Sequence, residues 1–307
     1  MLGVILASWV LTGCNLVFPL RGSDAAEDAA VLDANAPVSC TAPNSGWGNV
    51  SNDLLGAEFS STQEMSRPTI IDEPGVGGEV MLFDFDDTAA EPRRIRWAKF
   101  VSGNFVGQGN LSLATVFTSY DHPRLFANED NQPRLLFSGE TNDGSLGVFE
   151  ASPGAVFGRD WTATQVSLPP ELETMVVQLG TPGAHGTRVV AEADGRLIEL
   201  ERTSAGRYAL LEDTLDLVNQ AGGGSNPQLA DDGCWVVFSR FESGNLGDQD
   251  LYIATRQADG TFGTPVLLPS TSGVDERDPF ITPDLTRLYF VSESGNKLRP
   301  KFMTRSL

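Results

Sequence analysis

The sequence holds few of the residues and motifs that most often carry enzyme chemistry. Its 307 residues include only two histidines and three cysteines, and it has neither a CxxC nor an HExxH spacing, so no zinc site is predicted. A GxSxG elbow, a GxxxxGK(S/T) loop and a GxGxxG turn before a helix are also missing. We therefore predict no metal, no cofactor and no catalytic residue from motifs.

Basic residues and long apolar runs are scarce too. Aspartate and glutamate number 41 against 21 lysines and arginines, which gives a net charge near −20. Such a protein repels phosphate groups, so nucleic acid and anionic membrane surfaces are excluded as partners. The apolar run at residues 2–11 is too short to cross a bilayer as a helix. Contact with a membrane must therefore come through an anchor.

Helical patterns are rare. Glycine and proline, with 32 and 18 copies, interrupt the chain throughout, and no long stretch spaces its apolar residues at helical intervals. Residues 171–177 are the one short helical candidate, and their Val176-Val177 pair fits a strand equally well. These features predict an all-β fold.

What the chain does contain is a repeat. NPQLADDGCWVVFS at residues 226–239 and DPFITPDLTRLYFV at residues 278–291 align without a gap, 52 positions apart. Each copy reads as a proline-led strand, a turn and a strand that is apolar on both faces, as in a β-propeller blade. A hairpin at residues 250–268 supplies two more strands. One unit is therefore a blade of four antiparallel strands.

Weaker copies extend the pattern along the chain. Five prolines open the units at intervals that suit four-stranded blades: Pro68, Pro123, Pro182, Pro227 and Pro279. We predict five blades, with six as the alternative. Only three strands follow Pro279, so an N-terminal strand at residues 47–51 is expected to close the last blade.

The repeated units resemble a known family. The proline-led strand, the Asp-Gly turn, the VVFS strand and the DLYIATR segment are similar to the WD-repeat-like units of TolB-like β-propellers, common in bacterial envelope proteins. The resemblance is clear in two units and implies a ring of six blades. The second unit departs from the pattern, because Leu285 stands where the first has Gly233.

The N-terminus resembles a bacterial lipoprotein. The lipobox-like LTGC sequence at residues 11–14 implies that Cys14 is the lipid attachment site, although no lysine or arginine precedes the apolar run. An incidental cysteine in a frayed apolar segment is the alternative. We predict a signal peptide at residues 1–13, a disordered tether at 14–43 and a propeller at 44–307. Because Asn15 follows the cysteine, we expect a lipid-anchored protein of the outer membrane, periplasmic or surface-exposed.

A few further residues allow two readings each. Cys40 and Cys234 either form a disulfide or remain one buried and one free thiol. His122 precedes Pro123 at the start of a blade, where we expect a structural role in a loop rather than a catalytic role. The aspartates of a DxDD motif at residues 84–87 are calcium ligands or, more commonly, an exposed acidic strand edge.

Two functions fit this chain. The preferred one is a non-enzymatic binding or scaffold module that presents loops to an envelope protein or a glycan. The alternative is a glycoside hydrolase, because five-bladed propellers also carry sugar-cleaving enzymes and this reaction needs a carboxylate pair. Two or three inward carboxylates with aromatic platforms in the central channel would favour hydrolysis, whereas a polar rim without a pocket would favour binding.

The repeat also makes a prediction about stability. Phe238 and Phe290 share one repeat position on a two-sided apolar strand and should be buried between blades. Arg202 and Arg256 share another position, at the end of a strand, and we expect their replacement to have little effect.

Overall fold

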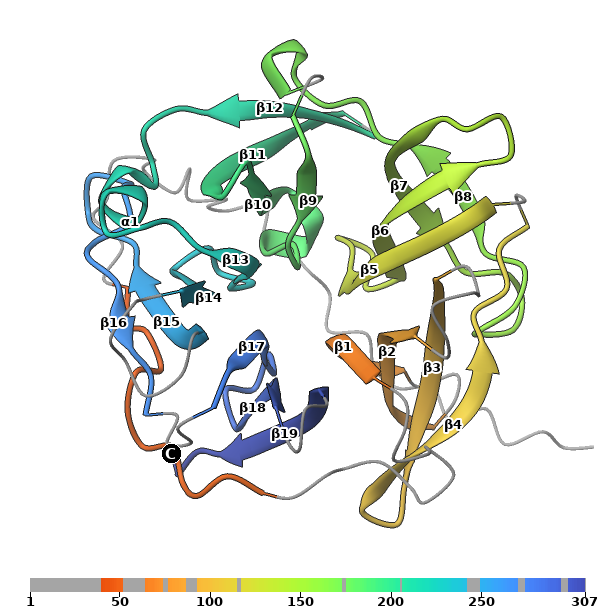
Figure 1. Ribbon diagram of the computed structural model, residues 1–307, viewed down its shortest axis with the longest axis horizontal. Helices are drawn as coiled ribbons and strands as arrows, with labels where there is room; N and C mark the ends of the chain where they lie inside the picture. Colours follow the sequence, from red (N-terminus) through yellow and green to blue (C-terminus); the bar gives the residue numbers. More distant parts are fainter. Residues whose placement is uncertain are drawn as a thin grey trace, which may run out of the picture. The chain divides into compact units, whose positions relative to one another are not determined.

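The protein is a five-bladed β-propeller built almost entirely from strands (Figure 1). The computed structural model describes residues 40–51, 64–73, 77–86, 93–114, 117–172, 175–204, 206–241, 249–269, 274–293 and 298–306. Four blades are sheets of four antiparallel strands, and the fifth has three strands and a closing segment. The prediction of five blades is confirmed, and the six-bladed alternative is wrong.

In each blade the strands run in chain order, and the innermost ones face the axis of the ring (Figure 1). The first blade comprises β1 (Glu64–Glu73), β2 (Gly78–Asp86), β3 (Arg94–Val101) and β4 (Asn104–Asn110). The second comprises β5 (Phe117–Ala127), β6 (Pro133–Thr141), β7 (Leu146–Ser152) and β8 (Thr162–Gln165). The third comprises β9 (Val177–Leu179), β10 (Arg188–Ala193), β11 (Arg196–Ser204) and β12 (Arg207–Leu211). The fourth comprises β13 (Ser225–Leu229), β14 (Trp235–Phe241), β15 (Gln249–Thr255) and β16 (Val266–Leu267). The fifth comprises β17 (Glu276–Ile281), β18 (Arg287–Glu293) and β19 (Leu298–Thr304).

Helical structure in the described residues is confined to short connections. These are the 3₁₀ turns η1 (Pro170–Leu172) and η2 (Ala184–Gly186) and the helix α1 (Asp216–Gln220). The candidate helix at residues 171–177 is therefore wrong, because η1 ends early and β9 starts at Val177. No helix in the described parts of the chain is both long and apolar enough to cross a membrane.

The N-terminal segment at residues 47–51 completes the fifth blade. Trp47 and Ser51 form antiparallel bridges with Arg305 and Phe302, and the Gly48 amide donates to the Thr304 carbonyl at 2.8 Å. This pairing covers the free edge of β19, which would otherwise expose unpaired backbone groups. The predicted closing strand is confirmed.

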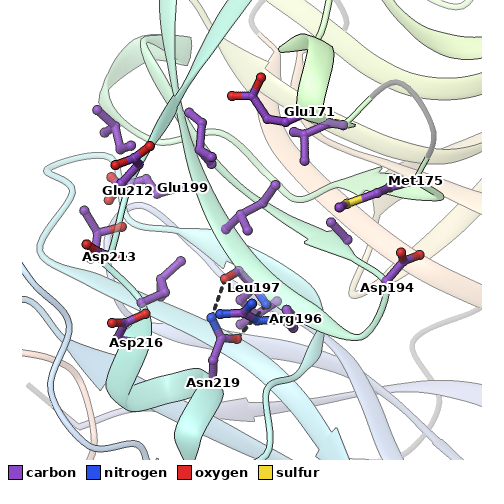
Figure 2. Close-up of a pocket in the computed structure, with 17 residues that line it drawn as sticks. Glu171, Met175, Asp194, Arg196, Leu197, Glu199, Glu212, Asp213, Asp216 and Asn219 are labelled. Atoms are coloured by element: carbon purple, nitrogen blue, oxygen red, sulfur yellow. Dashed lines mark hydrogen bonds between the residues drawn. The ribbon is translucent and has the colours of Figure 1, made fainter.

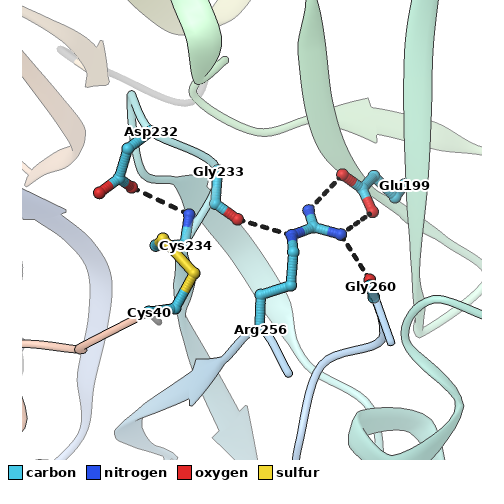
Figure 3. Close-up of a disulfide and its surroundings, with 7 residues drawn as sticks. All are labelled: Cys40, Glu199, Asp232, Gly233, Cys234, Arg256 and Gly260. Carbon is cyan, nitrogen blue, oxygen red and sulfur yellow. Dashed lines mark hydrogen bonds and ion pairs between the residues drawn. A yellow bond between two sulfur atoms is a disulfide. The ribbon is translucent and has the colours of Figure 1, made fainter. Parts of the chain in front are cut away.

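A disulfide joins this N-terminal segment to the fourth blade (Figure 3). Cys40 bonds to Cys234, which lies between β13 and β14, and Ala42 is buried nearby. The sequence alone does not decide this pairing, because the two cysteines lie 194 positions apart and belong to no known spacing motif. Closing so long a loop restricts the unfolded chain and stabilises the fold by up to about 5 kcal/mol.

Five apolar clusters fill the five interfaces between blades. Strand β14 illustrates this packing, because its apolar side chains alternate between the two faces of the fourth blade. Val236 and Phe238 pack with residues of the third blade, whereas Trp235 and Val237 pack with residues of the fifth. The middle strands are thus buried on both faces, as their sequences predict.

The two strong repeat units keep the same turn despite the change at Leu285. Gly233 has a φ angle of 70° and Leu285 one of 58°, so the leucine adopts the left-handed conformation that glycine adopts more easily. Asp284 supports this turn by accepting hydrogen bonds from the amide and the hydroxyl of Thr286. Asp232 accepts from the Cys234 amide in the same way, so an aspartate supports the turn in both units, with or without glycine.

Candidate active site

Four of the five innermost strands carry the same distortion. In β1, β5, β13 and β17 the pairing with the next strand shifts beside the anchor proline. The residues before these prolines are Arg67, His122, Asn226 and Asp278, with φ angles of 55°, 58°, 51° and 56°. A β-bulge places one extra, unpaired residue in a strand and changes the direction in which its side chain points. The repeat therefore brings four different polar side chains to the centre of the ring.

This backbone conformation is unusual for residues that carry side chains. A left-handed non-glycine residue costs about 1–3 kcal/mol and persists only where the surrounding structure holds it. Arginine at position 67 lacks even the tolerance that Asn, Asp and His have for this region. Strained residues concentrate at binding and catalytic sites, so the four bulges mark the channel as the candidate site.

Arg67 links the blades across this channel. Its guanidinium donates to Asp84 Oδ2 at 2.9 Å and to Asn226 Oδ1 at 3.3 Å. Its backbone amide donates to Asp278 Oδ2 at 2.9 Å. The His122 amide completes the network by donating to Asp84 Oδ1 at 2.8 Å. Two inward carboxylates from different blades, Asp84 and Asp278, are thus held by one arginine.

A cavity of about 280 Å³ opens beside this network. It is small for a ligand pocket, so its volume suits a small ligand rather than a large one. Phe85 adds an aromatic ring to a lining that is otherwise mostly polar. The lining residues are Ser66, Arg67, Asp84, Phe85, Arg93, Asn226, Gln249, Arg277, Asp278 and Leu298.

The two carboxylates differ in their surroundings. Burial raises the pKa of Asp84 above its ordinary value, although Arg67 and His122 act in the opposite direction. Asp278 accepts the Arg67 amide through Oδ2, while its buried Oδ1 has no hydrogen-bond partner among the described residues. Burial therefore favours the neutral form of Asp84 more than that of an exposed aspartate, and Asp278 keeps one oxygen without a partner among the described residues.

Further charged groups lie around this pair. Burial raises the pKa of Glu192, which lies near Arg67 and His122, and lowers the pKa of Arg124 to about 10. His122 Nδ1 lies 2.7 Å from Asp121 Oδ1. Burial acts to raise the pKa of Asp121, but His122 and Arg93 outweigh it and lower that pKa. The channel therefore contains both proton donors and proton acceptors.

Several sequence-based assignments need correction here. His122 does not serve a loop, because it lies within β5 and is buried at the channel. Asp84 is not an exposed edge residue, since it is 5% exposed and held by two donors. Asp87 and the Asp86 side chain lie outside the described residues, as does Cys14. The residue before four of the five anchor prolines was a signal for Arg67, His122, Asn226 and Asp278, but no such signal marks Asp84.

The described residues show no group of three or more histidine, cysteine, aspartate or glutamate side chains able to hold a metal ion.

The chain is similar in fold to solved structures of several sugar-cleaving enzymes. An α-L-arabinofuranosidase from Podospora anserina, in complex with cellotriose, has a TM-score of 0.56 at 12% identity, covering 86% of this chain and 98% of its own. A candidate glycosidase from Bacteroides thetaiotaomicron has a TM-score of 0.55 at 9% identity, with coverages of 90% and 96%. A candidate TolB from Agrobacterium tumefaciens scores 0.49 at 12% identity, with coverages of 80% and 79%. No protein-family model matches the chain, and neither does any curated protein.

These findings correct the expected function. The preference for a non-enzymatic binding or scaffold module is wrong, because glycoside hydrolases recur among the similar structures. The channel meets the carboxylate part of the criterion set for the alternative, since Asp84 and Asp278 line it, whereas the aromatic residue of the lining, Phe85, is only 5% exposed. Similarity at 9–12% identity establishes the propeller fold and not the reaction.

Proposed function

We propose that the protein is a glycoside hydrolase whose active site is the central channel. The observation that carries this proposal is the pair of inward carboxylates, Asp84 and Asp278, bound to one arginine beside a cavity of about 280 Å³. Hydrolysis of a glycosidic bond needs one carboxylic acid and one carboxylate on opposite sides of that bond. The similarity in fold to glycosidases supports the same reading.

Each carboxylate has a distinct role in this proposal. Asp84, with its raised pKa, protonates the leaving glycosidic oxygen as the general acid. Asp278 acts through its unpartnered Oδ1 as the base or nucleophile. Arg67 positions both, through its guanidinium and its backbone amide.

We expect Asp84→Asn and Asp278→Asn each to reduce kcat/KM by about a hundredfold or more, because each removes one half of the acid–base pair. The measurement is release of nitrophenol from a panel of nitrophenyl pentosides and hexosides with α and β linkages. Asp130→Asn is the matched control, since this exposed aspartate lies in the turn between β5 and β6, away from the channel.

The pH profile separates the two roles. Activity should fall at high pH as Asp84, whose pKa is raised by burial, loses its proton. Asp84→Asn should remove the fall at high pH from the residual activity, because the amide does not titrate. Full activity in either asparagine variant, or no hydrolysis of any substrate in the panel, would contradict the proposal.

We also propose that a lipid on Cys14 anchors the enzyme to the bacterial cell envelope. Its substrates would then be glycans of that compartment. The support is the sequence alone: an apolar run followed by LTGC at residues 11–14. Intact mass spectrometry of the protein from membranes should find a mature chain that starts at an acylated Cys14, and Cys14→Ser should abolish the modification. A chain that keeps Met1 would refute the anchor without affecting the channel chemistry.

A further inference from the structure

A second, larger cavity lies in the third blade. Its volume is about 480 Å³, and it shares no lining residue with the channel cavity. It opens between η1, the turn from β10 to β11, the end of β12 and the start of α1 (Figure 2). The proposed hydrolase does not use this cavity.

The wall of this cavity is predominantly apolar. Leu197 and Leu215 are buried at its base, and Ile198, Leu210 and Leu211 are partly exposed around it. Leucine and isoleucine offer no flat aromatic surface for a sugar ring to stack on. The wall therefore suits an aliphatic or other apolar body better than a glycan.

The rim of the cavity is acidic. Figure 2 shows the carboxylates of Glu212, Asp213 and Asp216 on one side of the cavity and those of Glu171 and Asp194 on the other. All five side chains belong to exposed residues, and the cation among the lining residues is Arg196. A positive group at the mouth would therefore lie between carboxylates from two sides.

Glu199 also lines the cavity, but its charge does not add to that of the rim. Arg256 neutralises it at 2.6 Å, so the attraction for a cation comes from the five exposed carboxylates.

We propose that this cavity binds a small organic cation: an apolar chain or ring that carries an ammonium group. The apolar body contacts the leucines and Ile198, because burial of apolar surface drives its entry. The ammonium stays at the mouth, where the rim carboxylates attract it. An anion of the same shape would gain the apolar contacts but meet repulsion at the rim.

Three probes of the same chain length test the charge preference. Octyltrimethylammonium, octyl glucoside and octyl sulfate are titrated by calorimetry below their micelle-forming concentrations. We expect the cation to bind most tightly, the neutral probe less tightly and the anion least. Equal affinities, or a preference for the neutral probe, would overturn the proposal.

Matched variants then separate the rim from the overall negative charge. Glu212→Gln with Asp213→Asn should weaken binding of the cation about tenfold, since each exposed ion interaction contributes modestly. Asparagine suits position 213, where φ is 60°. Glu129→Gln with Asp130→Asn removes the same charge at a distant turn and should leave the affinity unchanged. An equal loss in both double variants would show that net charge alone attracts the cation.

The apolar wall needs a separate variant. Leu211 is partly exposed and belongs to none of the five core clusters, so Leu211→Gln should leave the fold intact. We expect it to weaken all three probes by a similar factor, because it changes the wall and not the rim. Unchanged binding of the cation to this variant would overturn the placement of the apolar body.

Discussion

Arg256→Ala is expected to lower the free energy of unfolding by about 3–5 kcal/mol, because it removes the nearer of two cations beside a buried carboxylate and leaves Arg188, 3.8 Å away. Glu199 is 0% exposed and accepts two hydrogen bonds from the Arg256 guanidinium, at 2.6 and 3.1 Å (Figure 3). The same guanidinium donates to the carbonyl groups of Gly233 and Gly260, both at 2.7 Å. One side chain therefore holds the third and fourth blades together. Denaturant unfolding measures the loss.

Two variants test this explanation. Arg256→Met with Glu199→Leu should be less damaging than Arg256→Ala alone, because it removes both charges and keeps apolar volume. Arg202→Ala should cost less than Arg256→Ala, because Arg202 and its partner Glu150 are both more exposed than the equivalent pair. If Arg256→Ala unfolds like the wild type, the pair does not stabilise this interface.

This result would reverse the expectation from the sequence. The sequence predicts that the chain leaves the core at the end of β15, and hence that Arg256 and its repeat equivalent Arg202 are exposed. In the structure both reach back to a glutamate of the preceding blade, Glu199 and Glu150 respectively. The partner of Arg256 lies 57 positions away in the sequence, and nothing in the local pattern identifies it.

Phe238→Ala and Phe290→Ala should each cost about 3–5 kcal/mol, because each leaves a cavity between two blades. Both side chains are 0% exposed. Phe238 packs in the cluster between the third and fourth blades, and Phe290 in the cluster between the fourth and fifth. Since the two residues occupy one repeat position, their losses should be similar in chemical or thermal unfolding.

Phe241 provides the matched control on the same strand as Phe238. It is 62% exposed, so Phe241→Ala should change the free energy of unfolding by less than about 0.5 kcal/mol. A wild-type stability for Phe238→Ala or Phe290→Ala would mean that the inter-blade core does not depend on that position.

The fold could be read from the sequence because one local pattern recurs. The proline-led strand and the two-sided apolar strand appear in each strong unit, and a missing fourth strand pointed to residues 47–51. The candidate site could not be read in the same way. Arg67 and Asp278 meet across 211 positions, and only the closed ring brings them together. The repeat also does not predict the bulge in every blade. In the third blade, Thr181 precedes the anchor proline but does not adopt the left-handed conformation of its equivalents.

The bond between Cys40 and Cys234 also determines how the ring responds to pulling. Cys40 precedes the closing segment, so tension on the N-terminal end of the chain reaches the disulfide before it reaches residues 47–51. The load then passes to the fourth blade through a covalent bond. Without that bond, the force would act on the hydrogen bonds from Gly48 and Ser51 to β19 one after another. These bonds would break in sequence, and the closing segment would separate from the fifth blade. Reduction would thus move the mechanically weakest point of the protein to its closing strand.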